Sequence, residues 1–374
     1  MKIYGIHLID KLITGGDRRY VDLMNGLAES GNEVCVFVNE KFIHEFYQCK
    51  TIPVNLTFKK KQRISVQVRT ALKKLLVKQN QSSADYIIIF GETNWGAAKM
   101  LSKKTEAKII FAYRSSIIEE NRTILKYEKL QLTKKIILYL EILLTRLREK
   151  NIAHMASKIT FQTDFDKNNF LRRNKKAEAK CVVIRNDILR SRFSYELKNK
   201  NTSRNCKNLL YVGNYTERKG FSILLDALII LKSKGIHFNL SILSPVEFPE
   251  HLKEKKELIE NNLVFLPKSN NAMYFMIQSD LVIIPSLFDS YPNVIMEAIH
   301  TGTPVIGGNY SGMKYMLAEP DLLFQNGSSE SLAKKLEQCI SDVDYYQHIR
   351  ELCLSRRNFF EFDWIAEWND IMQS

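Results

Sequence analysis

Cysteine is scarce in this sequence and follows no pattern. The chain has 374 residues and six cysteines, at positions 35, 49, 181, 206, 339 and 353, with no Cys-x-x-Cys pair and no histidine pair at metal-binding spacing. A disulfide framework or a structural zinc site would need such spacing. We therefore expect reduced thiols in a cytoplasmic protein that has no structural zinc.

Long apolar runs are also missing. The N-terminal MKIYGIHLID lacks the apolar core of a signal peptide. The longest apolar segment, residues 136–144, is interrupted by Glu141 and is much shorter than the roughly 20 residues that cross a bilayer. Hydrophobic residues still make up 45% of the chain, which is enough for folded cores, and its length favours two domains. We expect a soluble two-domain protein.

Acidic residues are few in the first half of the chain. Residues 1–190 contain 36 lysines and arginines against 19 aspartates and glutamates, whereas residues 191–374 contain 19 against 22. This asymmetry favours contact of the first half with an anionic surface such as acidic lipid, an acidic polymer or nucleic acid. Lysines that only keep the surface soluble are the alternative, and the sequence leaves both open.

One segment of this basic half, residues 134–153, is an apolar stripe flanked by lysine and arginine. Such a helix could lie on a membrane surface, where a lipid-linked acceptor would be found. It could equally be a core helix of the first domain with no special role. We prefer the core interpretation.

Short apolar runs alternate with helix-like segments along the whole chain. Runs such as YIIIF (86–90) and KIIFAY (108–113) are typical of parallel strands that are buried on both faces. The alternation stops at a polar stretch, 196–208, which resembles a linker, and then starts again. The pattern predicts an α/β protein with two Rossmann-like doubly wound domains, 1–190 and 205–357. A ligand would lie between them, at the carboxyl ends of the strands.

The segment PSLFDSYPNVIMEAIHTGTPVI, residues 285–306, places two carboxylates around a predicted helix start. Pro292 suits the first turn of a helix that begins near Asn293, with Asp289 on the preceding loop and Glu297 about one turn inside. The helix N-terminus favours a phosphate, Glu297 could bind a ribose diol, and Asp289 could bind hydroxyls of a second polyol. The two would bracket a nucleotide diphosphate-sugar. A capping aspartate and a surface glutamate are the alternative.

Two further segments have chemistry suited to an anionic ligand. In YVGNYTERKGFSILLDAL, residues 211–228, Arg218 and Lys219 precede a predicted helix, where their charge would suit a pyrophosphate leaving group. In GGDRRYVDLMNGLAESG, residues 15–31, Gly15 and Gly16 would let the backbone approach a ligand closely. Solvated basic side chains and an ordinary turn are the respective alternatives.

Together these segments resemble the donor-binding elements of glycosyltransferase family 4. The resemblance implies a GT-B fold, with the closing helix at about 358–374 packing back on the first domain, and a nucleotide-sugar donor. It implies that Arg218, Lys219 and Asp289 carry catalysis. The donor contacts that it implies are Gly15, Gly16, Gly213, Asn214, Arg218, Lys219, Asp289, Ser290, Tyr291, Pro292, Asn293 and Glu297.

The sequence departs from the family pattern at several positions. Asp289 stands where the family usually has glutamate, Asn214 where many members have arginine, and Tyr315 where a further glutamate is usual. Arg114 stands at about the position where many family members have a histidine near the reacting sugar. Since arginine stays protonated, it could contact the sugar or acceptor but would be a poor proton shuttle.

A metal motif is a weaker possibility in the first half. Asp164 and Asp166 have Asp-x-Asp spacing, but their context, FQTDFDKNNF, favours the start of a helix. We therefore expect no metal and no cofactor, because the cations near the phosphates already neutralise them.

The sequence thus predicts a retaining glycosyltransferase that moves a sugar from a nucleotide diphosphate-sugar to a hydroxyl of a glycan or lipid-linked glycan, in cell-envelope polysaccharide synthesis. We expect a cytoplasmic location, with peripheral contact of the basic half at the inner face of the cytoplasmic membrane, and no nucleic acid. The alternatives are a non-catalytic GT-B partner subunit and a basic protein that binds nucleic acid or another anionic surface.

Overall fold

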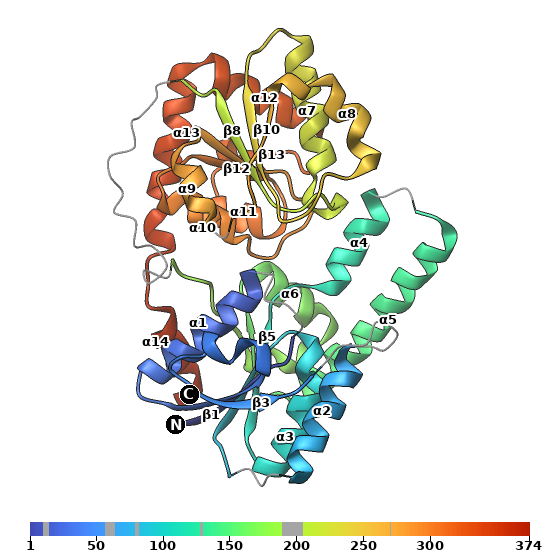
Figure 1. Cartoon of the computed structure of the whole chain (residues 1–374), viewed down its shortest axis with the longest axis vertical. Coiled ribbons are helices and arrows are strands. Elements are labelled where there is room, and N and C mark those ends of the chain that lie inside the picture. Colours follow the sequence, from blue (N-terminus) through green and yellow to red (C-terminus); the bar gives the residue numbers. More distant parts are fainter. Residues whose placement is uncertain (10–14, 57–63, 79–81, 128–129, 189–204, 270) are drawn as a thin grey trace. The chain divides into compact units, whose positions relative to one another are not determined.

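The computed structural model describes residues 1–374 except 10–14, 57–63, 79–81, 128–129, 189–204 and 270. The described residues form two compact units, each built on a parallel sheet (Figure 1). The first unit comprises Met1–Ser116, Ile142–Arg185 and Asp363–Ser374, and the second comprises Ile117–Glu141 and Asn186–Phe362. Most of the linker predicted at 196–208 falls outside the described residues.

The first unit contains a seven-stranded sheet among its described residues. Its spatial order is β3 (Lys50–Val54), β2 (Glu33–Asn39), β1 (Lys2–His7), β4 (Tyr86–Phe90), β5 (Lys108–Tyr113), β6 (Lys158–Phe161) and β7 (Cys181–Val183). The helices of this unit are α1 (Gly15–Glu29), α2 (Ile64–Lys78), α3 (Trp95–Thr105), α6 (Asp164–Arg173) and α14 (Trp364–Gln373). A long helix, α5 (Leu132–Met155), begins in the residue range of the second unit and ends in that of the first.

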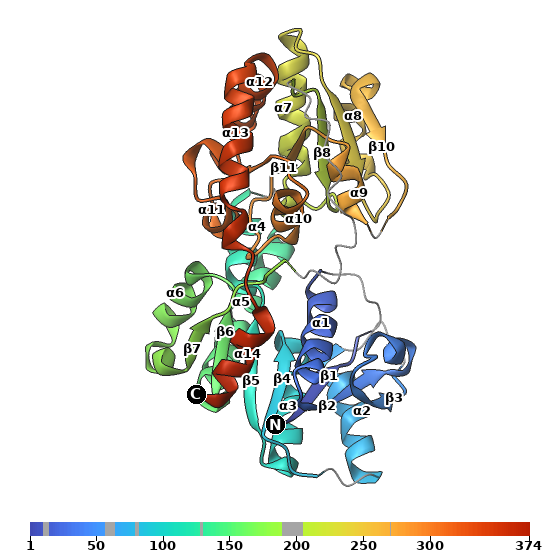
Figure 2. The same ribbon diagram turned by 90° about the vertical axis from the view of Figure 1, so that its left-hand side faces the viewer.

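The second unit contains a six-stranded sheet among its described residues. Its order is β10 (Leu263–Phe265), β9 (Asn239–Leu243), β8 (Asn208–Val212), β11 (Leu281–Ile284), β12 (Val305–Gly308) and β13 (Leu323–Phe324). Its helices are α4 (Ile117–Tyr127), α7 (Phe221–Ser233), α8 (Lys253–Leu258), α9 (Ala272–Ile277), α10 (Asn293–His300), α11 (Ser311–Leu317), α12 (Ser329–Ser341) and α13 (Val343–Ser355). Helices α7 and α12 lie side by side (Figure 1 and Figure 2).

These sheets confirm the predicted fold class of two Rossmann-like doubly wound domains. All described strand pairs are parallel, and central strands such as β11 are buried along their whole length, because helices cover both faces. Strands β3 and β13 were not predicted. The first contains Pro53, which is tolerated because β3 lies at the sheet edge, and the second has only two residues.

Helix α14 belongs to the core of the first unit. Its Trp364 and Trp368 are each 1% exposed, and Asn32 of the loop after α1 donates to Asn369 at 3.0 Å. A Cβ added to Gly26 of α1 would lie 2.5 Å from Cδ1 of Ile365, so this glycine allows α1 and α14 to approach closely. Both termini of the chain therefore lie on the first unit (Figure 1).

Helix α5 is not the core helix that we preferred from the sequence. A narrow stripe of α5 is buried, made up of Leu138, Ile142, Thr145, Glu149 and Ile152. The remaining apolar positions are exposed, by 73% at Leu132 and 57% at Leu147. The core interpretation is wrong because a run of apolar residues around the whole helix does not reveal how much of its circumference a neighbour covers.

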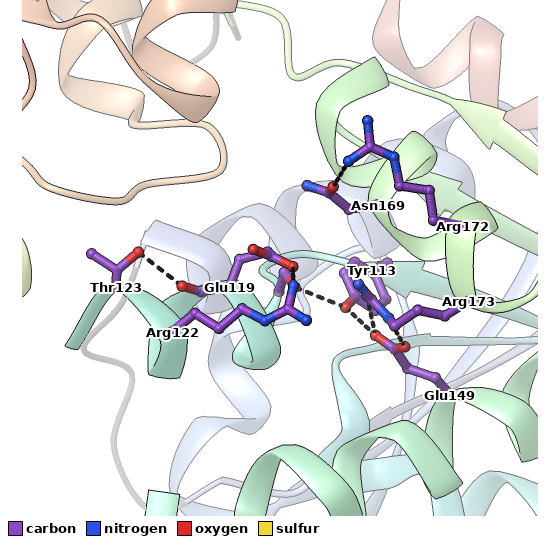
Figure 3. Close-up of polar contacts among 9 residues, drawn as sticks. Tyr113, Glu119, Arg122, Thr123, Glu149, Asn169, Arg172 and Arg173 are labelled. Carbon is purple, nitrogen blue, oxygen red and sulfur yellow. Dashed lines mark hydrogen bonds and ion pairs between the residues drawn. The ribbon is translucent and has the colours of Figure 1, made fainter. Parts of the chain in front are cut away.

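The buried stripe of α5 ends in an ion pair inside the first unit. The carboxylate of Glu149 is fully buried and accepts from Arg173 Nε at 2.7 Å, Arg173 Nη2 at 2.9 Å and Tyr113 Oη at 2.6 Å (Figure 3). Burial, and then the adjacent carboxylate, raise the pKa of Tyr113 well above its ordinary value, so the phenol stays protonated and donates. The network ties α5 to α6 and β5.

Candidate functional site

The site begins where the strand order of the second sheet reverses. Strands β8 and β11 are neighbours, and the chain continues from β8 to β9 on one side and from β11 to β12 on the other. Loops that follow two such strands diverge and leave a crevice at the carboxyl edge of the sheet. The loop after β8 carries Arg218 and Lys219, and the loop after β11 carries Asp289. The fold therefore brings these predicted residues to one place.

The two loops touch through their backbones. The amide of Leu287 donates to the carbonyl of Arg218 at 2.8 Å. Gly220 has φ +65°, and a Cβ at this position would lie only 1.9 Å from the carbonyl oxygen of Pro285. Both the left-handed conformation and the close approach require glycine. Gly220 lies in the sequence motif but was not among the predicted contacts.

Charged side chains of the two loops form a compact cluster. Lys219 Nζ lies 2.5 Å from Oδ2 of Asp289, and Arg218 Nη1 lies 3.9 Å from the same oxygen. Arg218 also donates to the carbonyl of Phe288 at 3.1 Å and pairs with Glu120 of α4 at 3.1 Å. Burial alone would raise the pKa of Asp289, but the attraction of Lys219 and Arg218 is stronger, and the net pKa is below the ordinary value. Asp289 is therefore ionised at neutral pH.

Helix α10 starts at Asn293, as the sequence predicts, with Pro292 as its N-cap residue. Tyr291 is 5% exposed and its hydroxyl donates to the backbone carbonyl of Asn186 at 3.2 Å. The side-chain amide of Asn186 donates to the side-chain oxygen of Asn293 at 3.3 Å. These bonds fix the entry of the chain into α10. Glu297 lies one turn inside this helix and is half-buried.

Buried polar atoms beside this loop lack partners within the described part of the chain. They are Oγ of Ser290, Oγ of Ser311 and Oδ1 of Asn326. Gly312, at the start of α11, donates to the Asp289 carbonyl at 2.9 Å, and a Cβ there would lie 2.1 Å from the Ser290 carbonyl oxygen. Buried hydroxyls are normally satisfied, so these atoms are suited to a polar ligand. Ser311, Gly312 and Asn326 were not among the predicted contacts, although Ser-Gly after a buried strand is a detectable signal.

A cavity of about 840 Å³ adjoins these loops within the second unit. It is lined by Asn309, Tyr310 and Asn326 from the loops after β12 and β13, and by Arg122 of α4 and Lys334 of α12, among others. The Asn326 side chain also donates to the carbonyl of Leu287 at 3.0 Å, which links the cavity wall to the loop that carries Asp289. The volume of the cavity is in the range of small-molecule binding sites.

The loop after β8 also positions two other predicted contacts. Gly213 donates to the carbonyl of Leu243 at 3.0 Å, and its extended backbone continues β8. The side chain of Asn214 accepts from the Thr216 hydroxyl at 2.9 Å, and its carbonyl accepts from Tyr211 Oη at 2.5 Å. Asn214 therefore shapes the loop with its own hydrogen bonds, where an arginine would carry charge.

The remaining predicted contacts belong to the first unit. Gly15 and Gly16 are the first two residues of α1, after the carboxyl end of β1. Arg114 follows β5, with its guanidinium 4.6 Å from the ring centre of Phe90. Arg19 of α1 is buried, with its guanidinium 5.5 Å from the ring centre of Trp364.

The Asp-x-Asp pair starts a helix, as expected. Thr163 caps α6 by accepting from the amide of Asp166 at 3.2 Å, and the Asp166 carboxylate accepts from the Thr163 hydroxyl at 3.0 Å. Among the residues that the structure describes, no group of three or more His, Cys, Asp or Glu side chains is arranged to hold a metal ion. None of the six cysteines, all of which lie in the described part of the chain, forms a disulfide. No described helix is long and apolar enough to cross a membrane.

Replacing Gly220 by alanine should destabilise the second unit by about 2 kcal/mol or more, since the left-handed conformation alone costs about 1–2 kcal/mol and the Cβ also meets Pro285. Urea unfolding followed by circular dichroism measures this cost. Gly235→Ala is the matched control, because Gly235 has φ +73° but no atom within 4 Å of its added Cβ. Equal costs at the two positions would contradict a role for the Gly220–Pro285 contact.

Comparison with known families finds a match in the half of the chain that contains this site. Residues 194–352 match the family model described as Glycosyl transferases group 1. An uncharacterized glycosyltransferase of Haemophilus influenzae is 25% identical, with 100% of both chains covered. The capsular polysaccharide biosynthesis glycosyltransferase CapM of Staphylococcus aureus is 25% identical over 35% of this chain and 36% of its own.

Solved structures show the same architecture over the whole chain. Anabaena Alr3699/HepE in complex with UDP and glucose superposes with a TM-score of 0.73 at 19% identity, covering 100% of this chain and 98% of that one. This likeness shows the GT-B fold. Taken together, the comparisons support a glycosyltransferase of the GT-B superfamily.

Proposed function

We propose that this protein is a retaining glycosyltransferase of family 4, which transfers a sugar, of the hexosyl type, from a nucleotide diphosphate-sugar to a hydroxyl of a glycan or lipid-linked glycan. The observation that carries the proposal is the cluster of Arg218, Lys219 and Asp289 at the strand-order reversal of the second sheet. Cations held beside a crevice at the carboxyl edge of a sheet suit a diphosphate.

The cations act on the leaving group. Lys219 has three ammonium donors, of which one is directed at Asp289, so others remain for phosphate oxygens. Arg218 is held by Phe288 and Glu120 and adds charge in a fixed position. Negative charge develops on the diphosphate as the glycosidic bond breaks, and prearranged cations stabilise that charge without reorganisation. The proposed reaction therefore requires no metal ion.

The two carboxylates hold the donor at its two ends. Glu297, half-buried on α10, is proposed to accept hydrogen bonds from the ribose hydroxyls. Asp289 is proposed to accept from sugar hydroxyls while it positions Lys219. The unpartnered hydroxyls of Ser290 and Ser311 offer further contacts to a polar ligand. Gly15, Gly16 and Arg114 remain proposed contacts from the first unit.

The acceptor is proposed to be part of a cell-envelope polysaccharide. Support comes from CapM, which is named for capsular polysaccharide biosynthesis. A lipid-linked acceptor would require contact with a membrane. We therefore include peripheral binding of the basic first half at the inner face of the cytoplasmic membrane in this proposal.

A thermal-shift panel of UDP, GDP and ADP with their common sugars tests the donor site. A ligand at about 100 times its Kd should add roughly 2.7 kcal/mol of apparent stability. We expect one nucleotide to stabilise the wild type and to have no effect on Glu297→Ala. Glu337→Ala is the control, since Glu337 is a glutamate of the same unit that pairs with Lys234 on its surface.

Each outcome of this panel has a definite meaning. No shift with any nucleotide would refute the donor site. A shift that Glu297→Ala retains would refute the role of Glu297. Nucleotide binding without any release of nucleoside diphosphate from the donor, in the presence of envelope glycan, would favour the non-catalytic partner instead.

A further inference from the structure

We propose that the outward face of helix α5, together with a basic pocket at its C-terminal end, is the surface by which this protein binds an anionic lipid bilayer. The inference rests on the peripheral membrane contact included in the proposed function, and it does not depend on the donor chemistry. It assigns that contact to one helix face and one pocket.

The outward face of α5 is apolar along most of its length. Leu132, Ile136, Tyr139, Leu143 and Leu147 follow the spacing i, i+4, i+7, i+11 and i+15, which places them on one side of the helix. Their exposed fractions run from 49% at Ile136 to 73% at Leu132. A soluble protein rarely leaves such a continuous apolar surface uncovered, and one with a polar margin usually marks an interaction site.

The same helix is anchored to the protein by its opposite side. Leu138, Ile142, Thr145 and Glu149 are 8% exposed or less, and Glu149 is held by the Arg173 and Tyr113 bonds. The apolar face is therefore held outward by a fixed attachment. It is available to a partner without any rearrangement of the core.

Basic side chains border the apolar face. Lys135 and Arg146 of α5 are exposed and lie three residues after Leu132 and Leu143, which places them beside the apolar face, whereas Glu141 is the one acidic side chain among residues 132–147. Lys150 continues the line of Leu143 and Leu147 by one further turn, since it lies seven residues after Leu143. An apolar helix face with a basic margin is the pattern of helices that lie in the interface of an anionic membrane.

The apolar face leads into a basic pocket in the first unit. The pocket has a volume of about 540 Å³, and its lining includes Lys150, His154, Arg172, Lys175, Lys176 and Lys180. Lys180 is engaged with the carbonyls of Ala153 and His154 at the end of α5.

Other cations of the pocket are available to a ligand. Lys150, Lys175 and Lys176 form no ion pair within the described part of the chain. No acidic residue lines the pocket. It therefore suits the phosphate of a lipid headgroup.

A bilayer fits these observations better than a second copy of the chain. A symmetric dimer through this face would bring two basic margins together, and like charges across an interface oppose association. An anionic bilayer offers an apolar phase for the leucines and phosphates for the lysines at the same time. Each lysine near such a surface strengthens binding by roughly a factor of five.

Vesicle flotation with the full-length protein tests this inference. One variant, Leu143→Asp/Leu147→Asp, alters the apolar face, and another, Lys175→Glu/Lys176→Glu, alters the pocket. Leu258→Asp/Val264→Asp and Lys234→Glu/Lys253→Glu are matched controls, because these side chains are exposed on the second unit and the charge changes are equal. Binding is compared on phosphatidylcholine vesicles with and without phosphatidylglycerol.

We expect the wild type and both controls to bind the phosphatidylglycerol vesicles at least about 100-fold more strongly than the neutral ones, since four exposed lysines, Lys135, Lys150, Lys175 and Lys176, each contribute about fivefold. The apolar-face variant should lose binding at least about tenfold. The pocket variant should bind anionic vesicles at least about 25-fold more weakly, because it lacks two lysines that each contribute about fivefold. Light scattering after size exclusion should give the same mass for all proteins.

Several results would overturn the inference. The assigned surface would be refuted if the wild type bound vesicles equally well with and without phosphatidylglycerol, or if the variants bound as strongly as the wild type. Either result would leave membrane contact through another surface open. A loss of oligomer in the apolar-face variant would assign the face to a second copy. If the wild type binds no vesicle, membrane contact itself fails. The nucleotide panel, run on the same preparations, separates that failure from a failure of the donor site.

Discussion

Replacement of Lys219 by methionine is expected to lower kcat for release of nucleoside diphosphate from the donor by about 10²- to 10³-fold, the usual effect of removing one prearranged group that stabilises transition-state charge. The Nζ atom of Lys219 lies 2.5 Å from Oδ2 of Asp289, and 24% of the Lys219 side chain is exposed, so the ammonium group is both fixed and accessible to a ligand. Methionine keeps the length of the stem and removes only the charge. Initial rates with the donor identified by the thermal-shift panel measure the effect.

Two further variants make this result specific. Lys219→Arg keeps the positive charge and should retain activity within about tenfold, because the geometry of the contact changes but its sign does not. Lys255 forms a comparable ion pair in the second unit, with its Nζ 2.7 Å from Oδ2 of Asp226. Lys255→Met removes this pair and should leave kcat unchanged. If Lys219→Met stays within threefold of the wild type, about 0.7 kcal/mol, the leaving-group role assigned to Lys219 is wrong.

Replacement of Glu149 by leucine should destabilise the first unit by about 3–5 kcal/mol, because it leaves the charge of Arg173 and the hydroxyl of Tyr113 without their buried acceptor. All three tryptophans of the chain, Trp95, Trp364 and Trp368, lie in this unit. Tryptophan fluorescence during urea unfolding therefore reports on the first unit separately from the second.

A double variant distinguishes loss of the ion pair from loss of packing. Glu149→Leu/Arg173→Met removes both charges and should recover at least half of the lost stability, although Tyr113 still lacks an acceptor as good as Glu149. Glu33→Leu, which breaks the exposed pair with Lys2, should cost about 1 kcal/mol or less. If Glu149→Leu lowered the free energy of unfolding as little as Glu33→Leu does, the buried network would not stabilise the first unit.

The fold class and several local features of the site could be predicted from the amino-acid sequence. Strands such as β11 and helices such as α7 were predictable because a buried parallel strand and an amphipathic helix differ in the period of their apolar residues. The start of α10 at Asn293 was predictable because Pro292 suits the beginning of a helix. These signals are local, so they survive without knowledge of the neighbours.

Which of these features come into contact depends on how the chain packs in three dimensions. Lys219 and Asp289 are 70 positions apart, and they form an ion pair because β8 and β11 are adjacent in the sheet, an order that no local pattern encodes. The unpartnered hydroxyls of Ser290 and Ser311 follow from the same packing of loops. The outward face of α5 was misjudged for a related reason. The periodicity of apolar residues indicates which side of a helix they occupy. Whether those side chains are exposed depends on which neighbouring elements cover them.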